Sequence, residues 1–227
     1  MVMLMEAGMV RIVTCTLLAL VAVSAAACTR EGTTTRAVPD PAVDLDGTVQ
    51  RNNIAVLAGG CFWCMEAVFE QLRGVSEVVS GYAGGSDTNA NYGAIASGAT
   101  HHAEAIRITY DPQMITYGQL LKVFFTVAHD PTQKDRQGPD TGPQYRSAIF
   151  TDDNEQRRVA EASIRQLEDG GVWPRPVVTI VEPLGRFYPA ETYHQDYVKR
   201  NPRHPYVVVN ALPKVAKLTR EFPDLAE

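Results

Sequence analysis

Hydrophobic positions along the chain alternate between strand and helix spacing from Ile54 onward. A short apolar run over 54–58 ends at two glycines, and this pattern predicts a buried strand. Met65, Val68 and Leu72 then recur at the spacing of one helix face, which predicts a helix soon after the glycines. The two elements are therefore joined by a tight turn that contains both glycines.

The same alternation continues to the end of the chain. It predicts strands over 75–82, 103–111, 145–150 and 176–183. It predicts helices over 117–128, 152–171 and 189–200, with one more in the C-terminal tail. Two long loops, one ending near Thr100 and one over 129–144, flank the strand that carries Glu104. Because long loops in compact domains tend to be functional, this strand is a candidate to carry a site.

Strand, helix, strand, strand, helix, strand is the order of a split β-α-β unit. We therefore predict an α+β fold, a two-layer sandwich with a ferredoxin-like core and extra loops and helices. No internal repeat is visible, and 227 residues suffice for one substantial domain or at most two small ones.

The first 28 residues have the layout of a bacterial export segment rather than of a folded domain. Arg11 precedes an apolar run over 12–23, and small residues follow up to Cys28. This run is too short and wrongly flanked for an ordinary membrane-spanning helix, but it is typical of a secretory signal. We therefore expect residues 1–28 to direct the protein to the periplasm or the cell envelope.

The end of this segment, SAAAC, resembles a bacterial lipobox, in which the cysteine is acylated and becomes the first residue of the mature protein. Ala25 stands where a lipobox usually has leucine, so a plain cleaved signal and an uncleaved anchor are alternatives. Met9 would give a tidier signal than Met1 and is an alternative start. If Cys28 is lipidated, the membrane is a partner of the chain through this anchor.

Residues 29–53 are rich in Thr, Pro and Asp and have no hydrophobic period. We expect them to be a flexible tether between the membrane and a folded domain over 54–227. The composition is ordinary for a soluble globular protein, with 45% hydrophobic and 21% charged residues. A formal charge of −5 and the lack of a basic stripe argue against nucleic acid as a partner.

Cysteine is scarce, with four in the whole chain. Export would remove Cys15 and lipidation would occupy Cys28, which leaves Cys61 and Cys64 as a C-x-x-C pair. At the junction of a strand and a helix, Cys61 would face unpaired backbone N–H groups and the positive end of the helix dipole, which favour a thiolate. A disulfide between the two closes only a tiny loop, so a redox-active pair is favoured over a structural disulfide.

Two large aromatic residues, Phe62 and Trp63, lie between these cysteines. They fit equally well as part of the core or as an apolar slot beside a reactive sulfur, since aromatic edges suit methyl-sulfur groups. The residues alone leave both interpretations open.

Four long stretches of the sequence share the order and spacing of one known family. They are GGCFWCMEAVFEQLRGVSEVVSGYAGG, HHAEAIRITYDP, LLKVFFTVAHDPTQKDRQGPDTGPQYRSAIF and YPAETYHQDYVKRNP. Together, from about Val56 to Pro202, they resemble the peptide methionine sulfoxide reductase A family. The tether and the residues from Arg203 onward lie outside the resemblance.

The resemblance implies an enzyme that reduces methionine sulfoxide, free or in proteins, and so repairs oxidised proteins. Cys61 would be the nucleophile that attacks the sulfoxide sulfur, releases methionine and becomes a sulfenic acid. Glu104 matches the family's acid, which supplies a proton to the departing oxygen, and burial on an apolar strand would raise its pKa enough. Without the resemblance, the alternation of the strand would also permit an exposed Glu104.

Further side chains match the substrate site of the family. Tyr92 and Tyr145 match two tyrosines whose hydroxyls hold the sulfoxide oxygen. Asp140 matches an aspartate that helps to order the site, and Phe62 and Trp63 match the pocket that grips the ε-methyl group. Without the resemblance, the two tyrosines and the aspartate would be taken for surface and turn residues.

The histidines are expected to be bystanders. His194 belongs to a matching motif, and we expect it to have a packing role. His101 and His102 are expected to lie in solvent rather than on a metal ion, and no metal is expected in the site.

Many members of this family have glycine at the position of Cys64, and their resolving cysteines lie near the C-terminus. No cysteine follows Cys64 in this chain. We therefore hypothesise that Cys64 resolves the sulfenic acid by forming a Cys61–Cys64 disulfide, which a thioredoxin-type dithiol then reduces. The resemblance also implies the S epimer as substrate, no bound cofactor and a monomeric enzyme.

Three other functions are open to the residues themselves. A thioredoxin-like dithiol-disulfide oxidoreductase also has C-x-x-C before a helix, but it needs no acid partner or tyrosines. A zinc deaminase shares the H-x-E pattern seen at 102–104, yet its cysteine pair should follow that motif and carry a proline. A metal-holding lipoprotein would have only a thin set of ligands here.

Overall fold

The computed structural model describes residues 37–45, 53–86 and 90–227. The expected export segment over 1–28 lies outside the described residues, as does most of the expected tether. None of the helices in the described ranges combines the length and the apolar character needed to cross a membrane.

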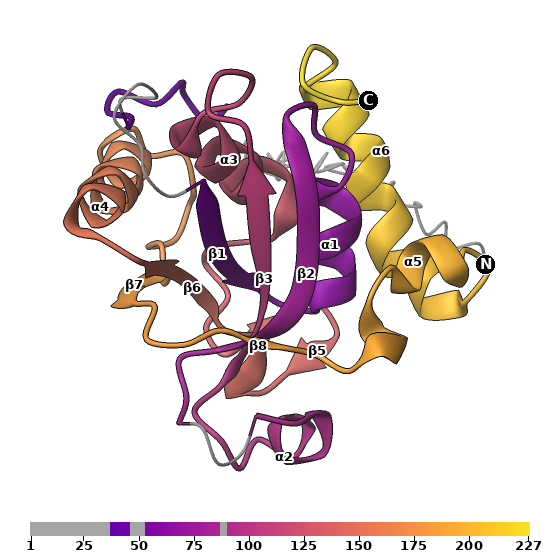
Figure 1. The fold of residues 1–227 in the computed structure, drawn as a ribbon. Coiled ribbons are helices and arrows are strands. Elements are labelled where there is room, and N and C mark those ends of the chain that lie inside the picture. Colours follow the sequence, from indigo (N-terminus) through magenta and orange to yellow (C-terminus); the bar gives the residue numbers. More distant parts are fainter. Residues whose placement is uncertain (1–36, 46–52, 87–89) are drawn as a thin grey trace, which may run out of the picture. The chain divides into compact units, whose positions relative to one another are not determined.

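A six-stranded sheet forms the centre of the domain, with the strand order β7-β6-β1-β3-β2-β8 (Figure 1). Its strands are β1 (Ile54–Gly59), β2 (Val75–Ala83), β3 (Ala103–Tyr110), β6 (Ser147–Thr151), β7 (Ile180–Pro183) and β8 (Tyr188–Pro189). Strand β3 lies between β1 and β2 and is antiparallel to both, and β6 is antiparallel to β1. The split β-α-β core predicted from the sequence is therefore confirmed, in an α+β fold.

Four helices supply the layer that covers one face of the sheet, and α6 packs on α1 (Figure 1). They are α1 (Phe62–Phe69), α3 (Tyr117–Val123), α4 (Asn154–Asp169) and α6 (Leu212–Glu221). The main core forms between this layer and the sheet residues that face it, such as Leu57, Ile106 and Ile149. Burial of this apolar surface is the principal stabilising contribution to the fold.

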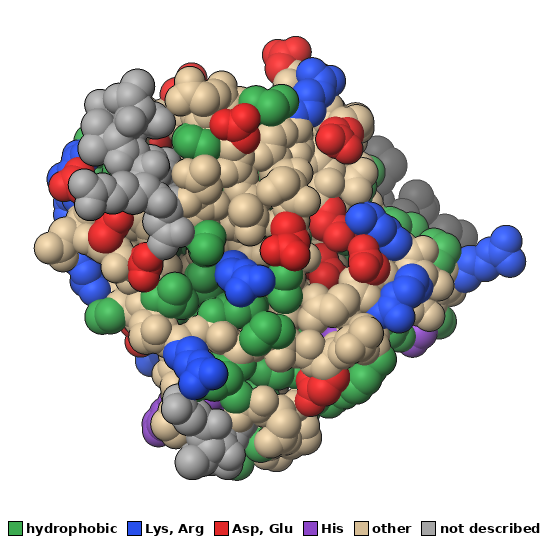
Figure 2. Space-filling model, viewed as in Figure 1, with side chains coloured by type: hydrophobic (Ala, Val, Ile, Leu, Met, Phe, Trp, Pro, Cys, Tyr) green, Lys and Arg blue, Asp and Glu red, His purple; other side chains and the backbone are tan. Residues whose placement is uncertain are grey.

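The other face of the sheet is lined mainly by alanine, which leaves room for the chain over 184–188 to cross it. A Cβ atom at Gly81 would lie 2.4 Å from the ring of Phe187, so only glycine permits this close approach. Arg107 lies over the same ring, 5.4 Å from its centroid. Figure 2 shows hydrophobic side chains gathered over the middle of this face, with basic side chains among them.

Both faces of β3 are therefore covered, which changes the burial pattern expected for it. The alternation in the sequence would also have permitted an exposed Glu104, but Ala103, Glu104, Ala105 and Ile106 are all buried. A central strand between two covered faces has no solvent side. Glu104 lies on the same face as Ile106, toward the helical layer.

The two long loops predicted from the sequence contain short elements. The loop before Thr100 includes α2 (Tyr92–Ala96), whose first turn is capped by the side chain of Asn91. The loop over 129–144 includes a small hairpin of β4 (Arg136–Gln137) and β5 (Asp140–Thr141). Neither element buries enough apolar residues to produce a periodic pattern.

Four predicted elements differ from the structure, one of them the strand expected over 176–183, which is β7 and starts only at Ile180. The helix expected over 189–200 is instead β8, a 3-10 turn η4 (Thr192–His194) and α5 (Tyr197–Arg200), because Asp196 takes a left-handed backbone conformation with φ 52°. The helix over 117–128 becomes the π-helix η2 (Phe124–Ala128) after α3. The strand expected from 145 starts later, after the 3-10 turn η3 (Pro143–Tyr145).

Part of the expected tether is held against the domain. Asp44 accepts hydrogen bonds from the backbone N–H of Gly118 (2.8 Å) and from the hydroxyl of Thr116, at the start of α3. Lys122 pairs with Asp40 at 2.7 Å, and Gln166 of α4 donates to the Asp40 carbonyl at 2.8 Å. The chain over 37–45 is therefore fixed to α3 and α4, whereas a free tether was expected.

The C-terminal segment also returns to the core. A π-helix, η5 (Val207–Ala211), leads into α6, and both pack on α1. The backbone N–H of Arg73 donates to the Leu225 carbonyl at 2.8 Å, which ties the end of the chain to the turn after α1. The C-terminal segment beyond Arg203 thus packs on the helix that carries the cysteine pair.

Candidate active site

The cysteine pair lies at the turn between β1 and α1. Cys61 is the N-cap residue of α1, and its carbonyl accepts the first helical hydrogen bonds from Cys64 and Met65. Gly60 precedes it with φ +92°, and a Cβ atom there would lie 2.5 Å from Gln137. Glycine is therefore required at this position both by the backbone conformation and by the close approach of the β4 chain.

Both thiols are free and nearly buried, with Cys61 8% and Cys64 2% exposed. A hydrogen bond joins the two sulfur atoms. Burial, and then the neighbouring Cys64 sulfur, raise the pKa of Cys61. The hydrogen bond from Cys61, followed by the positive charge of Lys214, lowers the pKa of Cys64. When the pair loses a proton, these shifts favour the charge on Cys64 rather than on Cys61.

This distribution corrects the expectation that Cys61 itself is ionised at the helix tip. The backbone N–H of Phe62 is one of the free donors of the first turn. It points to the Oε2 atom of Glu104, at 3.1 Å, and not to the Cys61 sulfur. The helix N-terminus thus orients the carboxyl group, and the two sulfurs share one proton between themselves.

Glu104 lies directly beside the cysteine turn and is 2% exposed. Burial raises its pKa to about 8, and the negative charges of Asp140 and Cys64 act in the same direction. The hydrogen bond from the Phe62 N–H opposes them. Most of the carboxyl is therefore protonated at neutral pH, so it can give a proton to an oxygen in the site.

Two phenols predicted from the sequence face the same place. Tyr92 is the first residue of α2 and Tyr145 the last of η3. Burial raises the pKa of both, and Glu104 and Cys61 act in the same direction once they are ionised. Both hydroxyls therefore remain protonated donors at neutral pH, and both lie within electrostatic range of Cys61 and Glu104, although α2 and η3 are distant in sequence.

Asp140, in β5, is tied to a residue that the sequence did not indicate. The hydroxyl of Tyr206 donates to Asp140 Oδ2 at 2.5 Å, and Tyr206 lines the same hollow as the two sulfurs. Burial raises the pKa of Asp140, while the bond from Tyr206 and the charge of Lys214 oppose the shift. Asp140 is thus brought to the cysteine pair, and Tyr206 connects them.

The aromatic residues between the cysteines have different environments. Phe62 is buried, with its ring 5.9 Å from Tyr82 and 4.9 Å from His194. Trp63 is half-buried and stacks on Tyr197, with the ring centroids 3.7 Å apart. Phe62 therefore belongs to the core, while Trp63 presents part of its surface beside the thiols.

His194 lies in this aromatic group. Its Nδ1 atom accepts a hydrogen bond from Trp63 Nε1 at 3.1 Å, so the proton of the neutral ring is on Nε2. Burial lowers the pKa of His194, which keeps the ring neutral. Its ring lies 4.5 Å from that of Tyr92. The packing role expected for His194 agrees with this position, and the ring also orients Trp63.

Glu191 is a further site residue that the sequence analysis missed. It accepts hydrogen bonds from the backbone N–H of Tyr92 and from the hydroxyl of Tyr82, each at 2.9 Å. Tyr82 pairs with Glu104 across β2 and β3. One carboxylate therefore holds the start of α2, and with it Tyr92, against the sheet.

The histidines at 101 and 102 differ from each other. His101 is exposed, as expected, but His102 is completely buried, and its Nε2 atom lies 2.9 Å from the Ser86 carbonyl. The expectation that His102 lies in solvent is therefore wrong, because the residue directly precedes the central strand β3 and its ring packs against that of Tyr188, with the centroids 5.3 Å apart. Within the ranges that the structure describes, no group of three or more His, Cys, Asp or Glu side chains could hold a metal ion.

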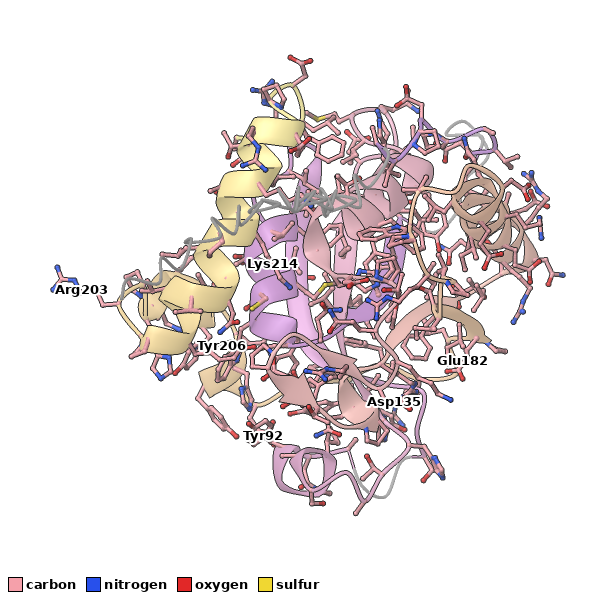
Figure 3. All side chains as sticks on the ribbon, turned by 180° about the vertical axis from the view of Figure 1, so that it is seen from behind. Tyr92, Asp135, Glu182, Arg203, Tyr206 and Lys214 are labelled. Atoms are coloured by element: carbon pink, nitrogen blue, oxygen red, sulfur yellow. The ribbon has the colours of Figure 1, made fainter. Side chains whose placement is uncertain are left out.

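The C-terminal helical segment completes the site. Tyr206, Asn210 and Lys214 line a hollow of about 60 Å³ together with Cys61 and Cys64. Figure 3 shows Tyr206 and Lys214 coming from this segment, on the same side of the molecule as Tyr92. The three residues are spaced four apart, so they share one helix face. This spacing was the available signal in the sequence, but nothing there indicated what the face would pack against.

The site combines a thiol that can be oxidised, a second thiol one helical turn away, a protonated carboxyl and two phenols. These groups define a thiol-dependent oxidoreductase. The sequence model of the family described as "Peptide methionine sulfoxide reductase" matches residues 53–225 of the chain. The expectation that the resemblance ends at Pro202 is therefore wrong, since the match includes most of the C-terminal segment. The chain therefore belongs to this family.

Individual proteins that are similar to this chain support the same family assignment. "Peptide methionine sulfoxide reductase MsrA 2" of Synechocystis is 51% identical over 192 residues, which are 83% of this chain and 90% of the relative. "Peptide methionine sulfoxide reductase MsrA" of Thermus thermophilus is 51% identical over 172 residues, which are 76% of this chain and 96% of that protein. The reduced crystal structure of Mxr1 from Saccharomyces cerevisiae has a TM-score of 0.62 and 30% identity, covering 74% of this chain and 94% of that one.

Proposed function

We propose that this enzyme reduces the S epimer of methionine sulfoxide, free or in oxidised proteins, with Cys61 as nucleophile and Glu104 as acid. The observation that carries the proposal is the contact between the cysteine turn and a buried carboxyl, with Phe62 N–H to Glu104 Oε2 at 3.1 Å. Reduction of a sulfoxide requires both a nucleophile for sulfur and a proton for oxygen. A thioredoxin-like oxidoreductase, the alternative function, would have no use for the acid.

The protons of the first half-reaction balance within the site. As the Cys61 sulfur attacks the sulfoxide sulfur, the proton that it shares with Cys64 moves to Cys64. Glu104 gives its proton to the sulfoxide oxygen, while Tyr92 and Tyr145 donate hydrogen bonds to that oxygen as it gains charge. The oxygen ends on Cys61 as a sulfenic acid, methionine leaves, and Glu104 is left as a carboxylate.

Cys64 then resolves the sulfenic acid. Its sulfur is hydrogen-bonded to that of Cys61, so a disulfide requires little movement. Attack of Cys64 on the Cys61 sulfur releases the oxygen as water. A thioredoxin-type dithiol reduces the resulting Cys61–Cys64 disulfide, and no bound cofactor takes part.

The choice of epimer gives a direct test of the function. With dithiothreitol as reductant and a chelator present, the enzyme is expected to consume one half of a racemic methionine sulfoxide peptide and to leave the other half unchanged, because each epimer has its own class of reductase. Chiral chromatography of the remaining substrate should show that only the R epimer persists. Consumption of the R epimer, or dithiol-disulfide exchange without any sulfoxide reduction, would contradict the proposal.

We also propose that the protein acts in the cell envelope, attached through lipid on Cys28. Support comes from the apolar run over 12–23 and the small residues before Cys28. After expression of the full chain in a bacterium, we expect envelope fractions to contain protein cleaved before Cys28 with an acylated N-terminus, measured by mass spectrometry. The Cys28→Ala variant should lack the lipid mass. Unprocessed wild-type protein in the cytosol would exclude this location.

A further inference from the structure

The hollow beside the two sulfurs has a cation in its wall. Lys214 of α6 lines it together with Cys61, Cys64, Asp140 and Tyr206. The proposed first half-reaction involves the thiols, the acid and the phenols, but Lys214 has no role in it. A lysine beside a nearly buried thiol pair therefore requires a separate explanation.

Lys214 is held in place by the backbone. Its Nζ atom donates to the carbonyl of Ala128 at 2.6 Å, at the end of the π-helix η2. Lys217, one helical turn further along α6, donates in the same way to the carbonyl of Thr126. The two lysines thus have the same anchor, but Lys214 lines the hollow at the sulfurs and Lys217 does not.

The groups that act on the Cys64 sulfur come from every element around it. Those linked to it by hydrogen bond or charge are Cys61 on its own helix, Lys214 on α6, Tyr206 before η5, Asp140 on β5 and Glu104 on β3. Lys214 is the cation of this set, and it lowers the pKa of Cys64. The two acids oppose it whenever they are ionised.

We propose that Lys214 is a positioning residue that holds Cys64 as a thiolate, so that Cys64 can attack oxidised Cys61. The inference rests on the proposed role of Cys64 as the resolving thiol. In that step Cys64 arrives protonated, because it has just received the proton of Cys61, and Glu104 beside it carries a negative charge. The ammonium of Lys214 offsets that charge and restores the thiolate.

The step balances with the groups at hand. The proton of Cys64 leaves, and its sulfur forms a bond with the Cys61 sulfur while the S–O bond of the sulfenic acid breaks. The Glu104 carboxylate takes up the proton of Cys64 and gives it to the departing hydroxide, which becomes water. Cys61 and Cys64 are oxidised to the disulfide, and no other oxidant is required beyond the sulfoxide already reduced.

Alkylation of Cys64 tests the inference without any catalytic turnover. In the full-length Cys61→Ser protein, iodoacetamide labelling of Cys64 is followed against pH by peptide mass spectrometry. Adding Lys214→Gln, which can keep the bond to Ala128 but not the charge, is expected to raise the pH midpoint by about one unit. Lys214→Arg should restore most of the shift, and Lys217→Gln should leave the midpoint unchanged.

A second measurement follows the resolving step itself. In protein with both cysteines, Lys214→Gln is expected to slow conversion of sulfenic acid to disulfide roughly tenfold at pH 7, with recovery at high pH, because a shift of one unit in pKa is a factor of ten in thiolate. Equal midpoints for Lys214→Gln and Lys217→Gln would overturn the inference. If the wild-type protein formed no disulfide at all, the role of Cys64 would fail, while the alkylation shift would still report on Lys214.

Discussion

Replacement of Cys61 by serine is expected to abolish sulfoxide reduction, with a loss on the order of 10⁶-fold, as for other covalent nucleophiles. Serine keeps the shape of the N-cap residue and can still take part in hydrogen bonds with Tyr206 and the Cys64 side chain. Its hydroxyl is a far weaker nucleophile toward sulfur than a thiol, and it cannot carry the oxygen as a sulfenic acid. Methionine released from a sulfoxide peptide, measured by mass spectrometry, should not exceed the uncatalysed background.

The Cys64→Ser variant is the matched control, because it removes the second thiol of the same turn. Without reductant it should still release one methionine per enzyme and keep a sulfenic acid on Cys61, which a dimedone probe can trap. The wild-type protein should instead contain a Cys61–Cys64 disulfide. Methionine release by the Cys61→Ser variant, or a stable sulfenic acid in the wild type, would show that these roles have been assigned incorrectly.

The hydrophobic periodicity of the sequence was sufficient to predict the elements that form the core of the fold. Apolar residues at strand or helix spacing predicted β1, α1, β2 and β3, because each of these elements contributes apolar side chains to the main core. Elements held by polar contacts were missed. Helix α2 depends on the Asn91 cap and on Glu191, and the helix expected over 189–200 is interrupted at Asp196. Such contacts join residues that are distant in sequence, so local patterns do not reveal them.

The sequence also predicted which residues form most of the site, but it did not predict their charge states. The resemblance placed Glu104, Tyr92 and Asp140 near the cysteines, and the structure brings them together. The pKa of Cys61 could not be predicted from its position at a helix start, because burial and then the neighbouring Cys64 sulfur both raise it. The positions of Tyr206 and Lys214 follow from how α6 packs on α1, which is a tertiary contact.

The burial of Glu104 links the fold to the chemistry. Its strand is central and covered on both faces, with alanine on either side of it. A carboxyl at the edge of the sheet would be solvated and ionised at neutral pH. The chain over 184–188 covers one face of this strand, and α1 covers the other. This cover excludes water and therefore keeps the pKa of Glu104 high.

Replacement of Glu104 by glutamine is therefore expected to slow the first half-reaction by about 10²- to 10⁴-fold, because the amide cannot supply an acidic proton. Glutamine can still accept the hydrogen bond from Phe62, so the turn and the substrate affinity should be largely preserved. Single-turnover release of methionine, measured with saturating sulfoxide and no reductant, isolates this step. Equal rates for the variant and the wild type at neutral pH would exclude Glu104 as the proton donor.

The pH dependence gives a second signature of the same group. Burial raises the pKa of Glu104 from 4.5 to about 8, so the acid is protonated below that pH and loses its proton above it. The rate of the wild-type step should therefore fall above about pH 8, and this decline should be absent in Glu104→Gln. Glu66 is equally buried, with a pKa raised by burial to about 7, but no contact with the sulfurs involves it. The Glu66→Gln variant should keep the decline in rate above pH 8. If the decline were absent in this variant, the titrating group would be Glu66 and not Glu104.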